Sequence, residues 1–340
     1  MNAARFQAIA SAYSRLRIAV IGDFCLDRYL EIDPARGEVS IETGLAVYNV
    51  VNVRSQPGAA GTILNNLVAL GVGEIHPVGF CGLDGEGFEL RRSLLARTGT
   101  RLDHFIETEL RRTFTYCKPL VMEPGKAPLE LNRLDSKNWS PTPESLQRQL
   151  IDSVRRLARE GQVDAFILMD QVDVPETGVI TSLLLEAVRQ LVVEHPRLLI
   201  LADSRRSLSG WPPVCLKMNA VELAALMKTR AGLSLEEIRE AAVALARRNG
   251  RDVFVTLSER GILGATSGGE VYHVPSLPIR GEIDIVGAGD AVTANLTCAL
   301  AAGASTHEAV VIANAAASVV IHQLGTTGTA SPAQVAELLG

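Results

Sequence analysis

Short runs of valine, isoleucine and leucine alternate with stretches of helical pattern from residue 142 onward. Strands buried on both faces of a parallel sheet are continuously apolar, whereas strands with one solvated face alternate apolar and polar residues. This order of runs predicts an α/β fold, with helices on both faces of a mainly parallel sheet. We expect strands at 165–170, 198–203, 215–218, 252–257, 261–265 and 271–274, and helices at 142–160, 175–194, 220–228, 234–249, 288–302, 306–323 and 332–339.

The N-terminal part begins in the same way but contains two segments of a different pattern. We expect a buried strand at 17–23, a helix that follows Pro57-Gly58 and ends at Leu70, a strand at 74–81, and a helix at 85–98 capped by Asp84. Residues 29–53 and 105–122 instead alternate apolar and polar side chains. The sequence therefore predicts one domain, residues 1–340, with a small antiparallel β lid formed by insertions at about 29–53 and 105–135.

Composition and charge exclude several classes of protein. Apolar residues make up 47% of the 340 residues and aromatic residues 4%, and the formal charge is −5. A nucleic-acid partner would need a basic face, so we expect none. The chain has no signal-peptide pattern at its start and no run of about 18 apolar residues, so we expect no membrane contact and a cytoplasmic location. Its five cysteines and six histidines lack the spacing of disulfides or a structural metal site.

A glycine-rich segment, Gly287-Ala288-Gly289-Asp290, comes directly before an apolar helical run. Glycine lets a ligand approach the main chain, and the first amides of a helix attract anions. A carboxylate among these donors suits a base that takes a proton from an alcohol as it attacks a phosphoryl group. The alternative is that Asp290 only caps the helix.

Carboxylates also follow several of the expected strands. Asp23 and Asp27 come after the first strand, and Asp170 and Asp203 end two later ones. Because parallel strands end at one edge of a sheet, these side chains should face a common crevice. The sequence contains no G-x-x-x-x-G-K-[ST], no complete G-x-G-x-x-G and no G-x-S-x-G, which argues against a P-loop protein, a Rossmann-type oxidoreductase and a serine hydrolase.

In their order along the chain, these segments resemble the ribokinase/PfkB carbohydrate kinase family. The family's C-terminal signature is D-T-x-G-A-G-D, and the chain has Asp284-Ile285-Val286-Gly287-Ala288-Gly289-Asp290. Other similar segments lie at 22–29, 57–58, 219–222 and 256–261. Within the family, the chain is most similar to the heptose-phosphate kinase branch. This similarity rests on G-D-x-x-L-D-R-Y at 22–29 and on segments 40–42, 133–135, 313–317 and 324–326. We expect the nucleotidyltransferase half of bifunctional relatives to be absent.

The resemblance implies a ribokinase-like three-layer α/β/α sandwich and an ATP-dependent kinase that requires Mg²⁺ and acts on a sugar or sugar phosphate. It implies that Asp290 is the general base, and that Gly287, Ala288 and Gly289 form the anion hole. The residues that it places around the sugar are Asp23, Asp27, Gly58, Thr62, Asp170 and Arg133, with Lys118 as a second cation for a phosphate already on the sugar. One alternative is that Asp23 and Asp27 only cap turns. The other is that Arg133 and Lys118 are ordinary solvated surface residues.

The same resemblance implies a nucleotide site. The residues that it assigns to this site are Asn219, Glu222, Thr256, Ser258, Gly261, Asn314 and Gly325. Glu222 would hold Mg²⁺ through water, and Asp284 near the Gly325 loop would contribute to a site for a monovalent cation such as K⁺. A capping box formed by Asn219 and Glu222 is an alternative or additional role, and Asn314 could instead be a packed polar residue of a helix.

Two departures from the heptose-phosphate kinase pattern leave the acceptor open. Where that branch reads P-G-G-A-A-N, the chain has Ala59 in place of the second glycine and Thr62 in place of asparagine. A lost hydrogen-bond partner discriminates strongly between substrates, so the acceptor sugar is expected to differ. The alternatives are a non-catalytic sugar or nucleotide sensor of the same fold, and a kinase of a nucleoside or other alcohol. The lid strands suggest a homodimer that pairs through the lid.

Overall fold

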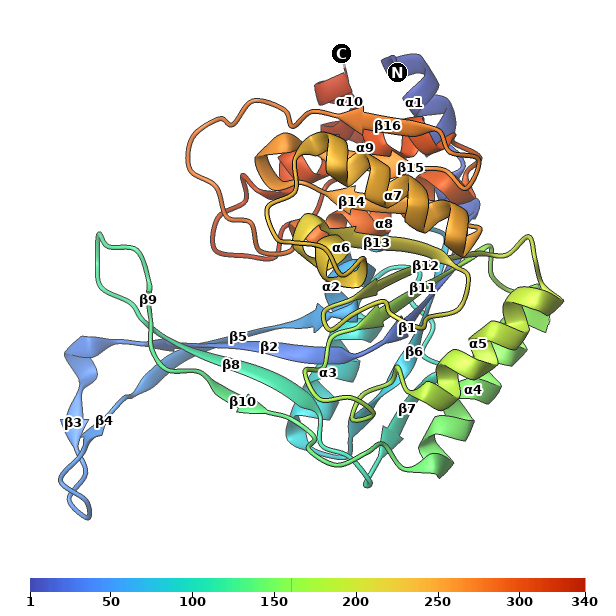
Figure 1. Cartoon of the computed structure of the whole chain (residues 1–340). Coiled ribbons are helices and arrows are strands. Elements are labelled where there is room, and N and C mark those ends of the chain that lie inside the picture. The colour runs from blue at the N-terminus through green and yellow to red at the C-terminus, as the bar shows by residue number, and fades with distance from the viewer. Residues whose placement is uncertain (160, 340) are drawn as a thin grey trace.

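A nine-stranded sheet forms the centre of the molecule in the computed structural model, which describes residues 1–159 and 161–339 (Figure 1). The strand order is β16-β15-β14-β13-β12-β11-β1-β6-β7, and only the pairs β14–β15 and β15–β16 are antiparallel. The mainly parallel sheet predicted from the sequence is therefore confirmed. Its strands are β1 Arg17–Gly22, β6 Glu74–Gly82, β7 Phe105–Thr108, β11 Ala165–Asp170, β12 Leu199–Ser204, β13 Cys215–Asn219, β14 Val253–Thr256, β15 Ile262–Ala265 and β16 Val271–Val274.

Helices cover both faces of this sheet, so that it separates two hydrophobic cores. In β1, for example, Ala19 and Ile21 belong to one core, whereas Ile18 and Val20 belong to the other. This alternation explains why the central strands are continuously apolar. The first core is covered by α4 Glu144–Arg159, α5 Ser182–Glu194, α6 Ala220–Leu226 and α7 Leu235–Asn249, and the second by α1 Ala3–Ala10, α2 Ala60–Ala69, α3 Gly85–Leu95, α8 Ala288–Ala301, α9 Thr306–Val320 and α10 Pro332–Leu339.

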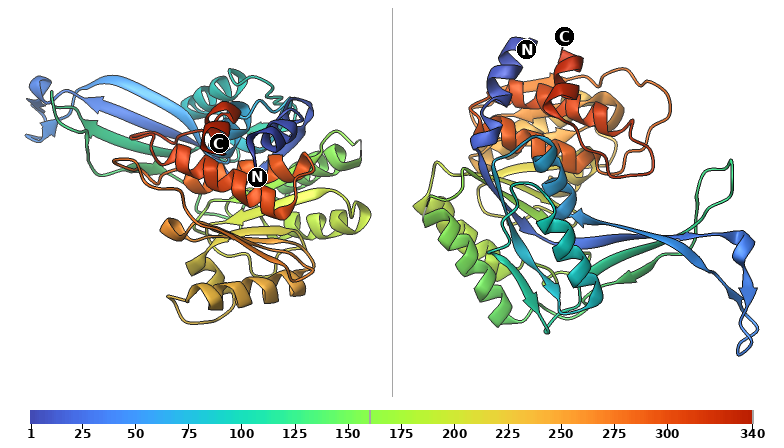
Figure 2. Two further views of the ribbon diagram at one scale, coloured as in Figure 1. Left: turned by 90° about the horizontal axis from the view of Figure 1, so that it is seen from above. Right: turned by 180° about the vertical axis from the view of Figure 1, so that it is seen from behind.

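A second sheet projects from the side of this three-layer body and forms the lid (Figures 1 and 2). Its strand order is β10-β8-β2-β5, and β9 pairs with β8. A small hairpin of β3 and β4 lies beyond it. The lid strands are β2 Phe24–Ile32, β5 Val50–Ala59, β8 Phe114–Val121, β9 Leu129–Glu130 and β10 Leu134–Ser136, and the hairpin strands are β3 Glu38–Val39 and β4 Ala46–Val47.

The lid differs from the prediction in its boundaries and in one pairing. It begins at Phe24 instead of residue 29, and β5 continues past residue 53 to Ala59, so Pro57-Gly58 lies in a strand and the helix begins at Ala60. The segment 105–108 is not part of the lid, because β7 pairs with β6 at the edge of the main sheet. The lid is mostly antiparallel, but β2 and β8 are parallel.

Most predicted helices are present, with shifted ends. The side chain of Asp84 accepts a hydrogen bond from the Gly87 amide and caps α3 as predicted. α5 begins at Ser182 instead of residue 175, because Thr181 caps it and residues 175–181 form turns. The predicted end of the 142–160 helix falls on residue 160, which lies outside the described residues, as does residue 340. In the part of the chain that the structure describes, no helix has the length and apolarity needed to cross a bilayer.

Candidate active site

The predicted site residues converge on the edge of the sheet where the parallel strands end. β1, β11, β12 and β13 all terminate there, and the first turn of α8 and the root of the lid lie against the same edge (Figure 1). Ligands of open α/β sheets bind at this edge. The strand-end carboxylates therefore lie at one edge of the sheet, as the sequence predicted.

Asp290 lies in the first turn of α8 but does not cap it. Gly287 is the N-cap residue, with a left-handed backbone at φ 82°, and Asp290 is the third residue of the helix. The carboxylate of Asp290 makes no hydrogen bond to the residues that the structure describes. The N-cap alternative is therefore wrong, and the carboxylate is available to a ligand.

The environment of Asp290 favours its protonated form more than water does. Burial is the main cause that raises the pKa of this carboxyl to about 7, and the negative charges of Asp203 and Asp27 add to it. Lys217 acts in the opposite direction. A carboxyl with a pKa near neutrality is well matched to accept a proton at physiological pH.

The amides of the first turn are partly free. The Ala288 N–H donates to the Ile285 carbonyl at 3.2 Å. The N–H groups of Gly289 and Asp290 follow it and have no partner among the described residues, as is usual at a helix start. These two amides are consequently the donors that an anion at this helix end can use without displacing a bond.

A buried ion pair that the sequence analysis missed lies beside this turn. Lys217 Nζ on β13 donates to Asp203 Oδ2 on β12 at 2.7 Å, and Thr293 Oγ1 on α8 donates to the same oxygen at 3.0 Å. Burial opposes the charged form of Lys217, but Asp203 outweighs it and keeps the lysine pKa above its ordinary value. The available sequence signal was a lysine inside an otherwise apolar strand.

Asp27 lies on the lid strand β2, and its negative charge acts on Asp290. A Cβ atom added at Gly58 on β5 would collide with its carboxylate, so glycine is required beside Asp27. Burial raises the pKa of Asp27, while Lys118 and Arg133 lower it. The structure therefore places Asp27, Gly58 and both predicted cations together at the root of the lid.

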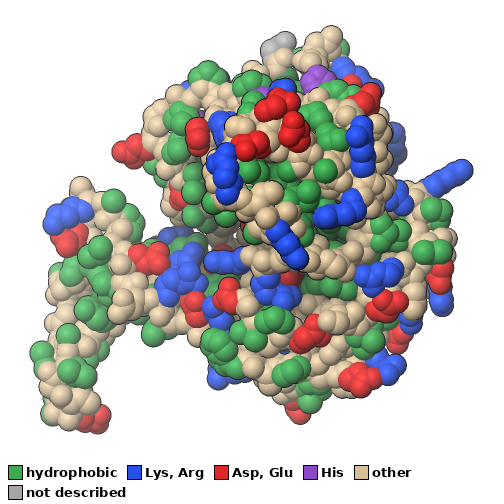
Figure 3. All heavy atoms as spheres, in the orientation of Figure 1, with side chains coloured by type: hydrophobic (Ala, Val, Ile, Leu, Met, Phe, Trp, Pro, Cys, Tyr) green, Lys and Arg blue, Asp and Glu red, His purple; other side chains and the backbone are tan. Residues whose placement is uncertain are grey.

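The two cations lie over aromatic rings of the lid. Lys118 Nζ is 4.9 Å from the centre of the Tyr29 ring, and the Arg133 guanidinium is 4.9 Å from that of Tyr116. Arg133 also pairs with Asp135 at 2.8 Å. Figure 3 shows Lys and Arg side chains gathered where the lid meets the body. An anionic ligand bound there would meet this positive rim.

Asp23 and Asp170 lie at the same edge of the sheet, but both are buried and their carboxylates bond to other groups of the protein. Asp23 accepts hydrogen bonds from the backbone amides of residues 171, 172 and 179 at 2.7–3.3 Å. Asp170 accepts from Ser204 Oγ at 2.7 Å and pairs with Arg206 at 2.9 Å. Their contact with a sugar stays a prediction. Thr62, in the first turn of α2, is 2% exposed.

A cavity of about 360 Å³ is lined in part by Ala288 and Gly289 at the start of α8. It contains four of the residues predicted to bind nucleotide, and its walls are mainly apolar. Gly261 has a left-handed φ of 92°, and an added Cβ would collide with the Val274 carbonyl, so glycine is needed at this turn. The lining includes Thr256, Ser258, Gly261 and Asn314, the isoleucines 279, 283 and 285, and Ala288 and Gly289.

Asn219 and Glu222 lie outside this cavity lining and form the expected capping box. Asn219 Oδ1 accepts from the Glu222 amide at 2.9 Å, and Glu222 Oε2 accepts from the Asn219 amide at 2.7 Å. Burial, followed by repulsion from Asp203, raises the pKa of Glu222, while the Asn219 amide and Lys217 lower it. The second carboxylate oxygen has no partner among the described residues. Capping and a metal contact are thus compatible.

The donor set suits Mg²⁺ more than a metal held wholly by protein. Among residues 1–159 and 161–339, no group of three or more His, Cys, Asp or Glu side chains could hold a metal ion. Mg²⁺ keeps several waters and is usually bound by one or two carboxylates together with substrate phosphates. Glu222 fits such a site.

Three other predicted residues have internal partners. Asp284 accepts from the amides of Val286 at 3.0 Å and Gly325 at 3.2 Å, so the structure joins the two predicted members of the cation site. Asn314 donates to the Pro275 carbonyl at 2.8 Å and also lines the mainly apolar cavity. Their ligand contacts stay predictions.

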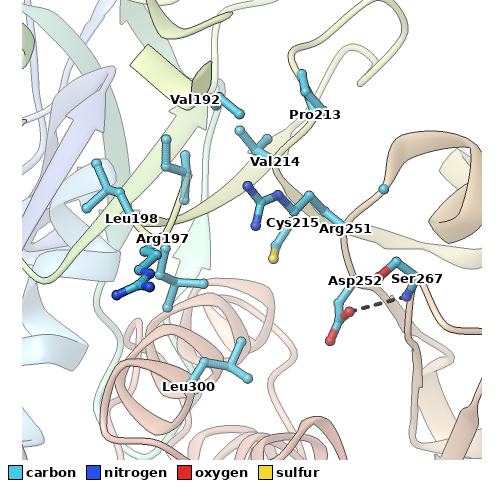
Figure 4. Close-up of a pocket in the computed structure, with 13 residues that line it drawn as sticks. Val192, Arg197, Leu198, Pro213, Val214, Cys215, Arg251, Asp252, Ser267 and Leu300 are labelled. Atoms are coloured by element: carbon cyan, nitrogen blue, oxygen red, sulfur yellow. Dashed lines mark hydrogen bonds between the residues drawn. The ribbon is translucent and has the colours of Figure 1, made fainter. Parts of the chain in front are cut away.

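A second cavity of about 360 Å³ lies at the opposite edge of the sheet, around the starts of β12, β13 and β14 (Figure 4). Arg197, Arg251 and Asp252 line it, and Asp252 accepts a hydrogen bond from the Ser267 amide at 3.4 Å. The lining contains none of the predicted site residues. This cavity is separate from the candidate site.

The fold and the site together are those of a carbohydrate kinase, a phosphotransferase with an alcohol group as acceptor. The model of the pfkB family carbohydrate kinases matches residues 17–334. The chain therefore belongs to the pfkB family of carbohydrate kinases, as its motifs suggested.

Curated relatives support the same branch of the family. The chain is 28% identical over 327 residues to the bifunctional protein HldE of Bradyrhizobium sp. strain ORS 278, and 30% identical over 331 residues to the protein of the same name from Gluconacetobacter diazotrophicus. Each alignment covers 96% of the chain but 64% of the relative. The chain thus spans slightly less than two thirds of their length.

Solved structures confirm the ribokinase-like fold. Ribokinase from Arabidopsis thaliana, solved with ribose and ATP, superposes with a TM-score of 0.67 at 20% identity, covering 95% of this chain and 98% of that one. Phosphofructokinase-2 from Escherichia coli, solved with fructose-6-phosphate, gives 0.67 at 17% identity with the same coverage. These similarities establish the architecture.

Proposed function

We propose that this chain is an ATP-dependent carbohydrate kinase that transfers the γ-phosphate of ATP to a hydroxyl of a sugar or sugar phosphate. The observation that carries the proposal is the position of Asp290. Its carboxylate, which has no hydrogen bond among the described residues and a pKa of about 7, lies at the start of α8 next to Ala288 and Gly289, which line the apolar cavity, and is influenced by the charge of Asp27.

In this mechanism the anion hole binds the phosphoryl group, and the base acts on the attacking hydroxyl. The free amides of Gly289 and Asp290 bind the γ-phosphoryl group, while Asp27 accepts hydrogen bonds from sugar hydroxyls and orients the acceptor. Asp290 takes the proton of the attacking hydroxyl. Glu222 would hold Mg²⁺ through water, and the ion would offset phosphate charge.

An acceptor that carries a phosphate of its own best suits the surroundings of Asp27. Lys118 and Arg133 lie on the lid, and the charges of both act on Asp27. A matched phosphate would be bound by these cations. Ala59 and Thr62 differ from the residues of the heptose-phosphate kinases that the chain resembles, which favours a different sugar phosphate.

An ADP-release screen tests the proposal. Purified protein with Mg-ATP is offered free and phosphorylated hexoses, pentoses and heptoses, together with nucleosides. We expect turnover with at least one sugar phosphate, and a fall of about 10²- to 10⁴-fold in kcat for Asp290→Asn. Ligand-induced thermal stabilisation without ADP release would instead favour the sensor, and turnover of nucleosides alone would favour the other kinase class.

A further inference from the structure

Lys217 is a charged side chain in the middle of a buried strand. Its neighbours Leu216 and Met218 belong to the core that α7 covers, so Lys217 points to the opposite face of the sheet, toward α8. Only 7% of its surface is exposed. Burial of an ammonium group is costly unless charged or hydrogen-bonding partners compensate it. The partners of Lys217 therefore decide whether its burial is compensated.

Asp203 accounts for only part of the hydrogen-bonding capacity of this lysine. An ammonium group has three protons, and one of them is donated to Asp203 Oδ2. Thr293 Oγ1 donates to the same oxygen and thereby orients Asp203. Among the residues that the structure describes, the other two protons of Lys217 have no acceptor. The ion pair by itself leaves the lysine unsatisfied.

The ammonium group lies against the first turn of α8. A Cβ atom added at Gly289 would be 3.1 Å from Lys217 Nζ. The free amides of Gly289 and Asp290 belong to this same turn and carry partial positive charge. Asp203, Asp290 and Glu222 supply negative charge around Lys217, but only Asp203 forms a hydrogen bond with it among the described residues. The unused protons of Lys217 and the free amides of the turn are therefore donors that can bind one further anion together.

We propose that Lys217 is a catalytic residue that binds the phosphoryl group being transferred, opposite the Gly289 and Asp290 amides. This inference rests on the proposed kinase function. The bond from the γ-phosphorus to the ADP oxygen breaks as the bond to the acceptor oxygen forms, and the acceptor proton goes to Asp290. Lys217 stabilises the charge on the non-bridging oxygens of this group during the transfer, and Asp203 and Thr293 position it.

The test compares nucleotides with and without the γ-phosphate. Titration calorimetry in Mg²⁺ measures the affinities of ADP and of the imido analogue of ATP for Lys217→Met, which keeps the length of the side chain and removes its charge. We expect the affinity for the analogue to fall at least about tenfold while that for ADP changes less than about threefold, and kcat to fall about 10²- to 10³-fold. Lys228→Met, at an exposed lysine after α6, is the control and should leave both affinities unchanged.

A purely structural lysine would give a different pattern. Equal losses for both nucleotides, or an unchanged ratio of affinities, would overturn the role of Lys217 and leave the kinase proposal standing. Because Lys217→Met leaves Asp203 unpaired, Lys217→Met combined with Asp203→Asn removes both charges and guards against misfolding. Recovery of the analogue affinity in this double variant would also overturn the role, and a persistent selective loss supports it. Wild-type protein that binds neither nucleotide would overturn both proposals.

Discussion

At the scale of single residues, the titration of Asp290 has a measurable kinetic consequence. Burial and the charges of Asp203 and Asp27 raise its pKa to about 7, against the opposing charge of Lys217. A base acts only when deprotonated, so kcat/KM should rise about tenfold per pH unit below about pH 7 and level off above it. Steady-state rates between about pH 5 and pH 9 measure this profile.

The same experiment has an internal control. Asp290→Asn removes the titrating group, so its residual rate should lose this limb of the profile. A wild-type profile that stays flat down to pH 5, as the ordinary aspartate pKa of 3.8 would give, would show that the raised pKa of Asp290 does not govern the reaction.

Ala59 gives a prediction for stability. Its backbone, at φ 54° and ψ −119°, is in a region that glycine adopts readily and other residues rarely do. Relief of this strain should exceed the entropy that glycine adds to the unfolded chain, so Ala59→Gly should stabilise the fold by about 1 kcal/mol. Urea unfolding measures the change.

The next residue is a matched control for this substitution. Ala60 is the first residue of α2, is fully buried and has a helical backbone. Ala60→Gly should therefore cost up to about 1 kcal/mol. If both substitutions were equally destabilising, the backbone of Ala59 would not be strained.

At the scale of elements, Asp23 ties the junction of β1 and β2 to the loop that follows β11. Its two oxygens accept from three backbone amides, and Gly178 lies so close that an added Cβ would collide with the carboxylate. Asp23→Ala would leave buried amides unpaired and should cost about 3 kcal/mol. Equilibrium urea unfolding measures it.

Asp33 provides the comparison for this carboxylate. At an exposed turn of the lid it accepts one hydrogen bond from a backbone amide, that of Ala35, and one from the side chain of Arg36 at 3.2 Å. Asp33→Ala should cost about 1 kcal/mol or less. If Asp23→Ala lowered the free energy of unfolding no more than Asp33→Ala does, the hydrogen bonds of Asp23 would not stabilise this junction.

The sequence predicted two kinds of element well. These are helix ends with a local capping residue, and strands whose burial on both faces makes them continuously apolar. The runs of β11 and β12 and the cap at Asp84 are examples. The parallel pairing of β2 with β8 could not be predicted, because lid strands with one solvated face do not fix their partner. Ala59 was expected in the segment that leads from Pro57-Gly58 into a helix, and only the pairing of β5 with β2 shows that it ends a strand.

The candidate site was predictable to a similar extent. The glycine-rich turn and Asp290 could be found because their residues are contiguous in the sequence. The pair of Lys217 and Asp203 could not, because it is defined by the register of two parallel strands. Nor could the sequence reveal that the Asp23 carboxylate accepts hydrogen bonds from amides about 150 residues away.

At the scale of the whole molecule, the lid leaves apolar surface exposed to solvent. Val51 and Val53 on the edge strand β5 are 50% and 44% exposed, and Ile41, between β3 and β4, is fully exposed. An edge strand with apolar side chains readily pairs with another chain. A monomer rarely exposes a large continuous apolar patch, so a second copy of the lid is the partner that we propose.

Homodimer formation through the lid can be tested with charges on the edge strand. Light scattering after size-exclusion chromatography should give twice the 36.4 kDa mass of the chain for the wild type. Val51→Lys combined with Val53→Lys should give monomers, because like charges would face each other across the shared edge. Val193→Lys, at an exposed valine of α5, should remain dimeric. A monomeric wild type at micromolar concentration, or a double variant that stays dimeric, would contradict pairing through β5. Because Asp27 and Gly58 lie on the paired strands β2 and β5, loss of the dimer should also weaken binding of the acceptor more than binding of the nucleotide.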